Sequence, residues 1–141
     1  MTRAVRDAIN TLAEDIAKDA DIDPSLIFEV VFVCNPVMHH LLLGIDPVEL
    51  GQAPFALATS ESVTLLAYDL DLTNIAKSAP IYVLPCIAGH VGADAAAVAL
   101  SEEPGKSDDL VLIVDVGTNA EILLGNTSRG FGLLFPNRSR I

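Results

Sequence analysis

An acidic residue and a turn of small polar residues follow an apolar segment in the C-terminal third of the chain. From Leu110 to Gly125 the sequence reads LVLIVDVGTNAEILLG, and Asp115 lies near the carboxyl end of a predicted buried strand. Gly117 lets the backbone approach a phosphate closely. Thr118 and Asn119 offer short polar groups to phosphate oxygens beside the turn amides. The pattern therefore indicates a phosphate-binding turn next to a carboxylate suited to holding a metal ion.

The same residues also suit an ordinary β-hairpin, because Asp, Gly and Asn are frequent turn residues. Short motifs recur by chance, so residue types alone leave both interpretations open. Glu121, in the strand after the turn, is equally ambiguous. It is either an acid that supports the site or a strand residue that faces solvent.

A second candidate position follows another apolar segment. The sequence IFEVVFVC, residues 27–34, predicts a buried strand, and apolar residues on both faces favour a parallel sheet. Asn35 and Pro36 then suit the cap and first position of a short helix, Val37 to Leu43, which Gly44 ends. Ligands of open α/β sheets bind at the carboxyl edge of the strands. Asn35 therefore either contacts a ligand or only caps the helix.

The other segments predict alternating helices and strands. Residues 2–20 carry apolar side chains at helical spacing, with charged residues such as Arg3 and Arg6 largely on the other side. The further predictions are a strand at 63–67, one or two helical turns at 70–78, a buried strand at 81–85, an Ala-rich helix at 93–100 and a charged turn at 101–109.

The histidines and cysteines form no recognisable site. His39 and His40 are adjacent, so their side chains cannot share one face of a helix, and His90 is isolated in a Gly-rich turn. Cys34 and Cys86 are too few and too far apart in sequence for a disulfide framework or a four-ligand metal site. We expect both cysteines to be small buried apolar residues. Nucleophilic catalysis has no support.

The composition suits one folded domain that avoids polyanions. The chain has 141 residues, 51% of them hydrophobic, which is enough to bury a core. Its 19 acidic and 8 basic residues give a net charge of −11, which disfavours nucleic acid and anionic membranes as partners. No apolar run approaches the ~20 residues of a membrane span. The N-terminus has no signal-peptide segment, so we expect a cytoplasmic protein.

Three fragments together resemble the ATP-dependent reductive activators of corrinoid proteins. They read VMHHLLLGIDPVELGQAPF, YVLPCIAGHVGAD and LVLIVDVGTNAEILLGN, in this order. Those activators are iron–sulfur proteins whose C-terminal half belongs to the actin-like ATPase superfamily. They use ATP to drive reduction of a Co(II) corrinoid to Co(I) on a partner corrinoid protein. The resemblance implies a partial ribonuclease-H-like α/β fold, with a mixed sheet flanked by helices.

The resemblance also implies which part of the family this chain represents. Residues 1–45 would end the first ribonuclease-H-like subdomain, residues 46–80 would connect, and residues 81–128 would begin the second; residues 129–141 form an atypical tail. ATP or ADP would bind with Mg²⁺, with Asp115 holding the metal, possibly through water, and the DVGTN turn near the phosphates. The family's upstream Asp-x-Gly-Thr motif is missing, and the [2Fe–2S] cluster belongs to a domain absent from this chain.

Two departures from the family pattern affect these expectations. The family has Gly-Asn-Thr-Thr-Met where this chain has CNPVM, residues 34–38, so a glycine and two hydroxyl groups are lost around Asn35. After Asn126 the family continues with small residues, whereas this chain reads RGFGLLFPNRSRI from Arg129. That change predicts a shifted reading frame or an artificial boundary at the tail.

These expectations lead to three candidate functions. The first is a fragment of a corrinoid activator that alone hydrolyses ATP weakly or not at all, because half of each subdomain would be missing. The second is a non-catalytic module that forms homodimers through exposed strand edges and apolar surface. The third is a small-molecule kinase of the same superfamily, for which the sequence shows no sugar-binding acid.

Overall fold

The computed structural model describes residues 1–116 and 120–134. The chain divides into two compact units, Met1–Asp94 and Ala95–Ile141. Among the described helices, none combines the length and the apolar character that a membrane crossing would need.

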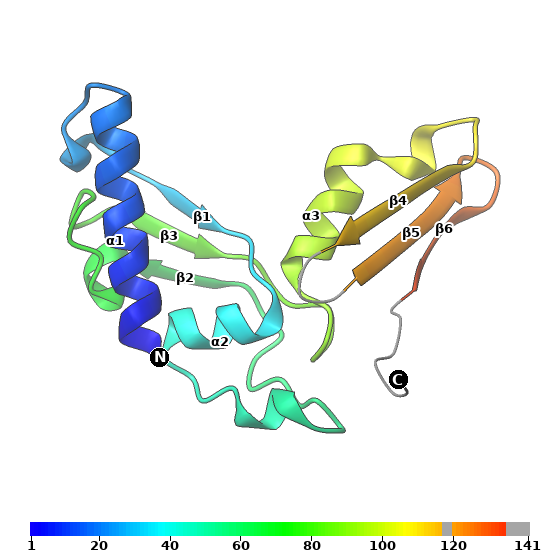
Figure 1. Ribbon diagram of the computed structural model, residues 1–141, viewed down its shortest axis with the longest axis horizontal. Helices are drawn as coiled ribbons and strands as arrows, with labels where there is room; N and C mark the ends of the chain where they lie inside the picture. Colours follow the sequence, from blue (N-terminus) through cyan, green and yellow to red (C-terminus); the bar gives the residue numbers. More distant parts are fainter. Residues whose placement is uncertain (117–119, 135–141) are drawn as a thin grey trace. The chain divides into compact units, whose positions relative to one another are not determined.

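The first unit is built on a three-stranded mixed sheet. Its central strand β3 is parallel to β1 and antiparallel to β2, in the order β1-β3-β2 (Figure 1). Along the chain the elements are α1 (Thr2–Asp19), η1 (Pro24–Leu26), β1 (Val30–Phe32), α2 (Pro36–Leu43), η2 (Val48–Gly51), β2 (Val63–Leu66), η3 (Ala67–Leu70) and β3 (Pro80–Val83), where η is a 3₁₀ helix. The expected mixture of helices with a mixed sheet is confirmed.

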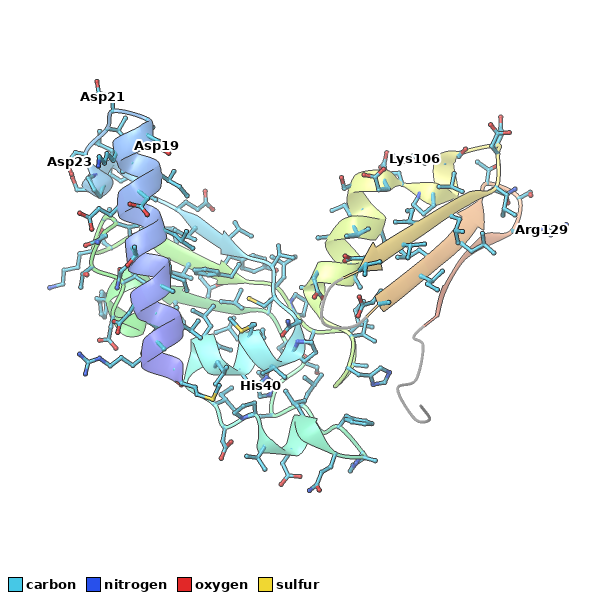
Figure 2. All side chains as sticks on the ribbon, in the orientation of Figure 1. Asp19, Asp21, Asp23, His40, Lys106 and Arg129 are labelled. Atoms are coloured by element: carbon cyan, nitrogen blue, oxygen red, sulfur yellow. The ribbon has the colours of Figure 1, made fainter. Side chains whose placement is uncertain are left out.

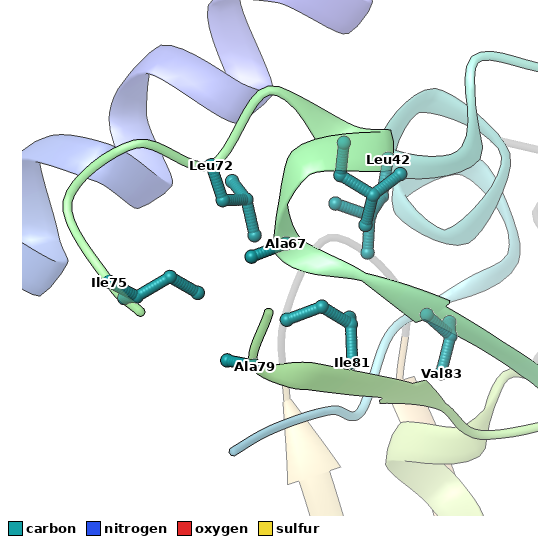
Figure 3. Close-up of a cluster of buried hydrophobic side chains, with 8 residues drawn as sticks. Leu42, Ala67, Leu72, Ile75, Ala79, Ile81 and Val83 are labelled. Carbon is teal, nitrogen blue, oxygen red and sulfur yellow. The ribbon is translucent and has the colours of Figure 1, made fainter. Parts of the chain in front are cut away.

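The core of this unit lies on the face of the sheet that α1 and α2 cover. Ile81 and Val83 of β3 are fully buried, and Ile9 and Ala13 of α1 pack against the same cluster. The buried cluster consists of Leu42, Ala67, Leu70, Leu72, Ile75, Ala79, Ile81 and Val83 (Figure 3). Burial of this apolar area supplies the main driving force for folding of the unit.

The opposite face of this sheet is uncovered, which corrects the expected strand at 27–34. Strand β1 is only three residues long, and Val31 and Val33 are 54% and 44% exposed. Its parallel pairing with β3 is confirmed. The apolar residues on both faces of β1 had predicted burial on both, but among the described residues of this unit the helices α1 and α2 pack on one face.

Side chains of α1 fix the segment that follows η3. The side chain of Asn10 accepts hydrogen bonds from the backbone N–H groups of Thr73, at 2.7 Å, and Asn74, at 3.2 Å. These two N–H groups therefore donate to a distant side chain and not to the carbonyl groups of a preceding helical turn. The predicted helix at 70–78 is therefore wrong, and the only helical turn nearby, η3, ends at Leu70.

Arg6 of α1 binds the C-terminal end of α2 and a residue that follows η3. Its Nε and Nη2 atoms donate to the carbonyl oxygen of Leu42 at 3.1 and 3.0 Å, and Nη1 pairs with Asp71 at 3.0 Å. Leu42 lies in the last turn of α2, where carbonyl groups lack helical partners. Arg6 thus closes the C-terminal end of α2, instead of lying on a solvent-facing side of α1.

The second unit is an antiparallel sheet preceded by helix α3. Its elements are α3 (Ala93–Glu102), which begins at the end of the first unit, η4 (Pro104–Lys106), β4 (Val111–Val116), β5 (Ala120–Asn126) and β6 (Gly130–Leu134). The sheet order is β4-β5-β6 (Figure 1). The helix predicted at 93–100 and the two strands around the DVGTN turn are confirmed. Strand β6 falls in the tail segment 129–141, of which residues 135–141 lie outside the described chain.

The predicted buried strand before Asp115 is only half-buried. Leu112, Val114 and Val116 are 61%, 51% and 76% exposed, whereas the residues between them are partly covered. This alternation is typical of an antiparallel strand with one covered face. The continuous apolar sequence had suggested cover on both faces.

The sheet of the first unit draws on all three predicted segments. Strand β1 lies in segment 1–45, β2 lies in segment 46–80, and most of β3 lies in segment 81–128. The division into compact units falls later, after Asp94. The assignment of these segments to family subdomains stays a prediction.

Candidate functional site

The loops that follow β1 and β3 meet at one edge of the sheet. The two strands are parallel, so their carboxyl ends, at Phe32 and Val83, lie at the same edge. The N–H of Leu84 donates to the carbonyl of Phe32 at 3.1 Å, and the N–H of Ala93 donates to the carbonyl of Cys34 at 3.0 Å. Helices α2 and α3 therefore both begin at this edge, where α/β sheets bind ligands.

Gly92 makes the close approach of these loops possible. A Cβ atom on Gly92 would lie 2.3 Å from the carbonyl oxygen of Cys34 and 2.6 Å from the Cα atom of Asn35. Atoms at those distances would overlap, so no larger residue fits without a shift of the backbone.

Asn35 caps α2 as predicted. Its side-chain oxygen accepts a hydrogen bond from the N–H of Met38 at 2.9 Å, and its backbone is extended, as at most helix caps. Pro36 is the first helical residue, and Gly44 ends the helix with a φ of 79°. The capping role is thus confirmed, while a ligand contact by Asn35 stays a prediction.

Two thiols and a carboxylate gather near the same edge. Burial, reinforced by the neighbouring Cys86 and Asp94, raises the pKa of Cys34 to about 11. Burial first, and the charge of Asp94 second, also raise the pKa of Cys86. Both thiols therefore stay protonated near neutral pH, and a protonated thiol is a poor nucleophile. Cys86 is buried, as expected, whereas Cys34 is only partly buried.

The side chains of His39 and His40 contact each other, although adjacent helical residues were expected to point in different directions. His39 and His40 are 0% and 1% exposed, and their Nδ1 atoms lie 3.4 Å apart (His40 is labelled in Figure 2). Adjacent residues on a helix do not normally face each other. Here His39, His40, Leu41 and Leu42 are all buried, so this turn of α2 is enclosed on more than one side. The apolar residues Leu41 to Leu43, which follow the histidines directly, could have indicated from the sequence that this turn is buried on more than one side.

In the second unit, the register of the hairpin brings two carboxylates together. Asp115 of β4 pairs directly with Glu121 of β5, and directly paired residues of antiparallel strands project from the same face. Both residues are partly buried. Gly117, Thr118 and Asn119, which complete the predicted phosphate turn, lie outside the described residues.

The chemistry of this carboxylate pair suits a hard divalent cation such as Mg²⁺. Like charges placed directly opposite each other destabilise a sheet, and a divalent cation would offset that repulsion. Mg²⁺ is typically bound by one or two carboxylates together with phosphates and water. Within residues 1–116 and 120–134, no cluster of three or more His, Cys, Asp or Glu side chains is arranged to hold a metal without such help. Asn35 belongs to the first unit and the acidic pair to the second.

Comparison with known proteins identifies the family. Residues 1–106 match the family described as the RACo middle region, so the chain belongs to the RACo middle-region family. The match lies in the middle region of such proteins, whereas the resemblance had suggested their C-terminal ATPase half. The actin-like ATPase assignment was a finer prediction that this match leaves open.

Two relatives give this family a functional context. The corrinoid activation enzyme RamQ of Eubacterium limosum is 32% identical over 126 residues, which cover 89% of this chain and 21% of RamQ. A solved structure described as a reductive activator for corrinoid, iron–sulfur protein is 28% identical with a TM-score of 0.81, over 95% of this chain and 21% of that one. The chain thus spans about a fifth of the length of these relatives.

Proposed function

We propose that this chain is part of an ATP-dependent reductive activator of corrinoid proteins. In this proposal it carries one phosphate-binding turn of an actin-like, ribonuclease-H-like ATPase. The observation that carries the proposal is the direct pairing of Asp115 with Glu121 on either side of the DVGTN turn. The names of both relatives, and the likeness to one of them in structure, support the activator class.

The roles of the residues follow from their chemistry. Asp115 would hold Mg²⁺, directly or through water, and Glu121 would stabilise the same ion from the neighbouring strand. The backbone of the turn would contact the phosphates of ATP or ADP. When bound, Mg·ATP supplies the free energy that makes an unfavourable electron transfer to a Co(II) corrinoid possible. Phosphate sites of this kind need positioned amides and carboxylates, and no covalent nucleophile.

Calorimetric titration of the chain with Mg·ADP and Mg·ATP tests the proposal. We expect binding that Asp115→Asn weakens at least about tenfold, the effect of losing roughly 1.4 kcal/mol. Asp109→Asn is the matched control, because it removes the same charge from an exposed position before β4. Equal affinity of the two variants, or no binding in the presence of magnesium, would contradict a phosphate site on this chain.

A second candidate function is supported by the uncovered face of the β4–β5 hairpin. Leu112 pairs with Leu124, and both are exposed, as are Val114 and Val116. Contiguous exposed apolar area is typical of interaction surfaces. We propose homodimer formation through this face as the alternative. Analytical ultracentrifugation of the chain and of the Val114→Lys variant tests this alternative. If the homodimer forms through this face, the unchanged chain sediments as a dimer and the variant sediments as a monomer.

A further inference from the structure

The direction of each hydrogen bond in the His39–His40 pair follows from one backbone contact. The N–H of Ala58 donates to Nε2 of His40 at 3.1 Å. A backbone N–H can only donate, so Nε2 of His40 acts as the acceptor and carries no proton. A neutral imidazole holds one proton, and that of His40 is therefore on Nδ1.

The proton of His39 is fixed by its contact with His40. Nδ1 of His40 lies 3.4 Å from Nδ1 of His39. Since the first nitrogen carries a proton, the second must accept it, and the single proton of neutral His39 is on Nε2. That nitrogen is buried and has no protein hydrogen-bond partner among the described residues. The pair is thus a one-way chain, from Ala58 through His40 to His39.

One additional proton disrupts this chain wherever it binds. On Nε2 of His40 it would face the N–H of Ala58, and on Nδ1 of His39 it would face the N–H of His40. The other groups around α2 offer no compensation. From α1, Arg6 reaches the carbonyl of Leu42, and in the described part of the chain neither imidazole forms an ion pair with a carboxylate. Burial first, and the neighbouring His40 second, also lower the pKa of His39.

The contact with Ala58 ties α2 to a segment that also touches the edge of the sheet. Phe55, three residues earlier, packs edge-on against His90 with ring centres 5.8 Å apart. The backbone of Phe55 lies very close to Gly89. A Cβ atom added to Gly89 would be 1.5 Å from the carbonyl oxygen of Phe55. The segment 52–58 therefore bridges α2 and the turn at residues 88–91.

We propose that His39 and His40 form a proton-sensitive latch, which holds the segment 52–58 on α2 when both rings are neutral and releases it when either ring is protonated. Release would also loosen the turn at 88–91, because Phe55 contacts it. The latch does not depend on nucleotide binding in the second unit. It is thus independent of the function proposed above.

Nuclear magnetic resonance of the 141-residue chain tests the latch directly. Long-range nitrogen–proton correlations at about pH 8, well above the ordinary histidine pKa of about 6.5, should show the proton of His40 on Nδ1 and that of His39 on Nε2. The exchange protection factor of the Ala58 amide should fall at least about tenfold as the pH drops to about 5. A proton on Nε2 of His40, or unchanged protection of Ala58, would overturn the proposal.

Two variants separate the latch from general effects of acid. In His40→Gln the side-chain oxygen still accepts a hydrogen bond but does not titrate, so protection of Ala58 should become independent of pH in this range. His90→Phe removes the third histidine of the chain but keeps an aromatic ring for Phe55 to pack against, and it should keep the wild-type transition. An unchanged transition in His40→Gln would refute the latch. If the His40→Gln variant does not fold, the proton positions measured in the wild-type chain still test the proposed latch.

Discussion

Gly92 and Cys34 touch through their backbones at the edge where α2 and α3 begin. The carbonyl of Cys34 accepts a hydrogen bond from Ala93, and it lies 2.3 Å from the position of a Cβ atom on Gly92. The contact therefore depends on the missing side chain. It fixes the loops after β1 and β3 against each other.

Replacement of Gly92 by alanine should destabilise the chain by about 1–3 kcal/mol, the usual cost of forcing an extra carbon into a packed site. The neighbouring atoms belong to backbone and cannot simply rotate away. Urea unfolding of Gly92→Ala measures this cost. Gly51→Ala is the matched control, because nothing lies within 4 Å of its added Cβ atom. Equal unfolding midpoints for the two variants would show that the loops adapt.

Arg6→Ala should lower the free energy of unfolding by about 1.5–3 kcal/mol, since it removes charged hydrogen bonds to the carbonyl of Leu42. The ion pair with Asp71 contributes little, because the Asp71 side chain is 80% exposed. Asp71→Asn should therefore have a small effect. Arg3→Ala, at a position whose side chain is 94% exposed, is the control in the same helix. A similar loss in Arg3→Ala would contradict the role of Arg6 at α2.

Asn35→Ala should cost about 1 kcal/mol through loss of the cap on α2, and Asn35→Ser should recover most of it. Thermal unfolding of both variants measures the difference. If serine fails to rescue stability, Asn35 does more than cap the helix. If alanine is harmless, the hydrogen bond to Met38 does not contribute measurably.

Stability should depend on pH through His39. Burial first, and the neighbouring His40 second, lower the pKa of His39 in the folded state. The unfolded state then binds more protons in the interval below its own pKa of about 6.5. Stability is therefore complete above that value and declines as the pH falls through the interval. Urea midpoints between about pH 8 and about pH 5 should show this decline.

In His39→Phe the same decline should be smaller, since one buried titrating group is removed. The pKa of Asp23 is also lowered, by its hydrogen bonds to Ser25, but from 3.8, so its contribution lies at more acidic pH. A decline of equal size in wild type and His39→Phe would assign the effect to another group.

The parts of the fold that the sequence predicted correctly depend on local chemistry. Asn35, Pro36 and Gly44 define both ends of α2 by their own backbone preferences, and the structure agrees at each. The contact between His39 and His40, by contrast, depends on the enclosure of α2 by distant segments. Likewise, the carbonyl that Arg6 binds lies 36 residues away in the chain. Such pairings have no local signature.

The error over burial has the same origin. The apolar residues of β1 and β4 predicted two covered faces, whereas Val31 of β1 and Leu112, Val114 and Val116 of β4 are more than half exposed. The sequence gives the polarity of a face, but not whether another segment packs on it. The pairing of Asp115 with Glu121 agrees with the ordinary hairpin that the sequence left open beside a phosphate-binding turn. The phosphate-binding role of the turn itself lies outside what hairpin geometry can predict.

The position of β3 in the sheet also has a consequence for synthesis on the ribosome. β3 lies between β1 and β2, which do not pair with each other, yet it is the last of the three strands in the chain. A nascent chain that ends before Pro80 therefore has no partner for either strand, and its apolar core residues stay exposed to water. Such exposed intermediates are prone to aggregate. We therefore expect the sheet of the first unit to form only after its central strand has emerged.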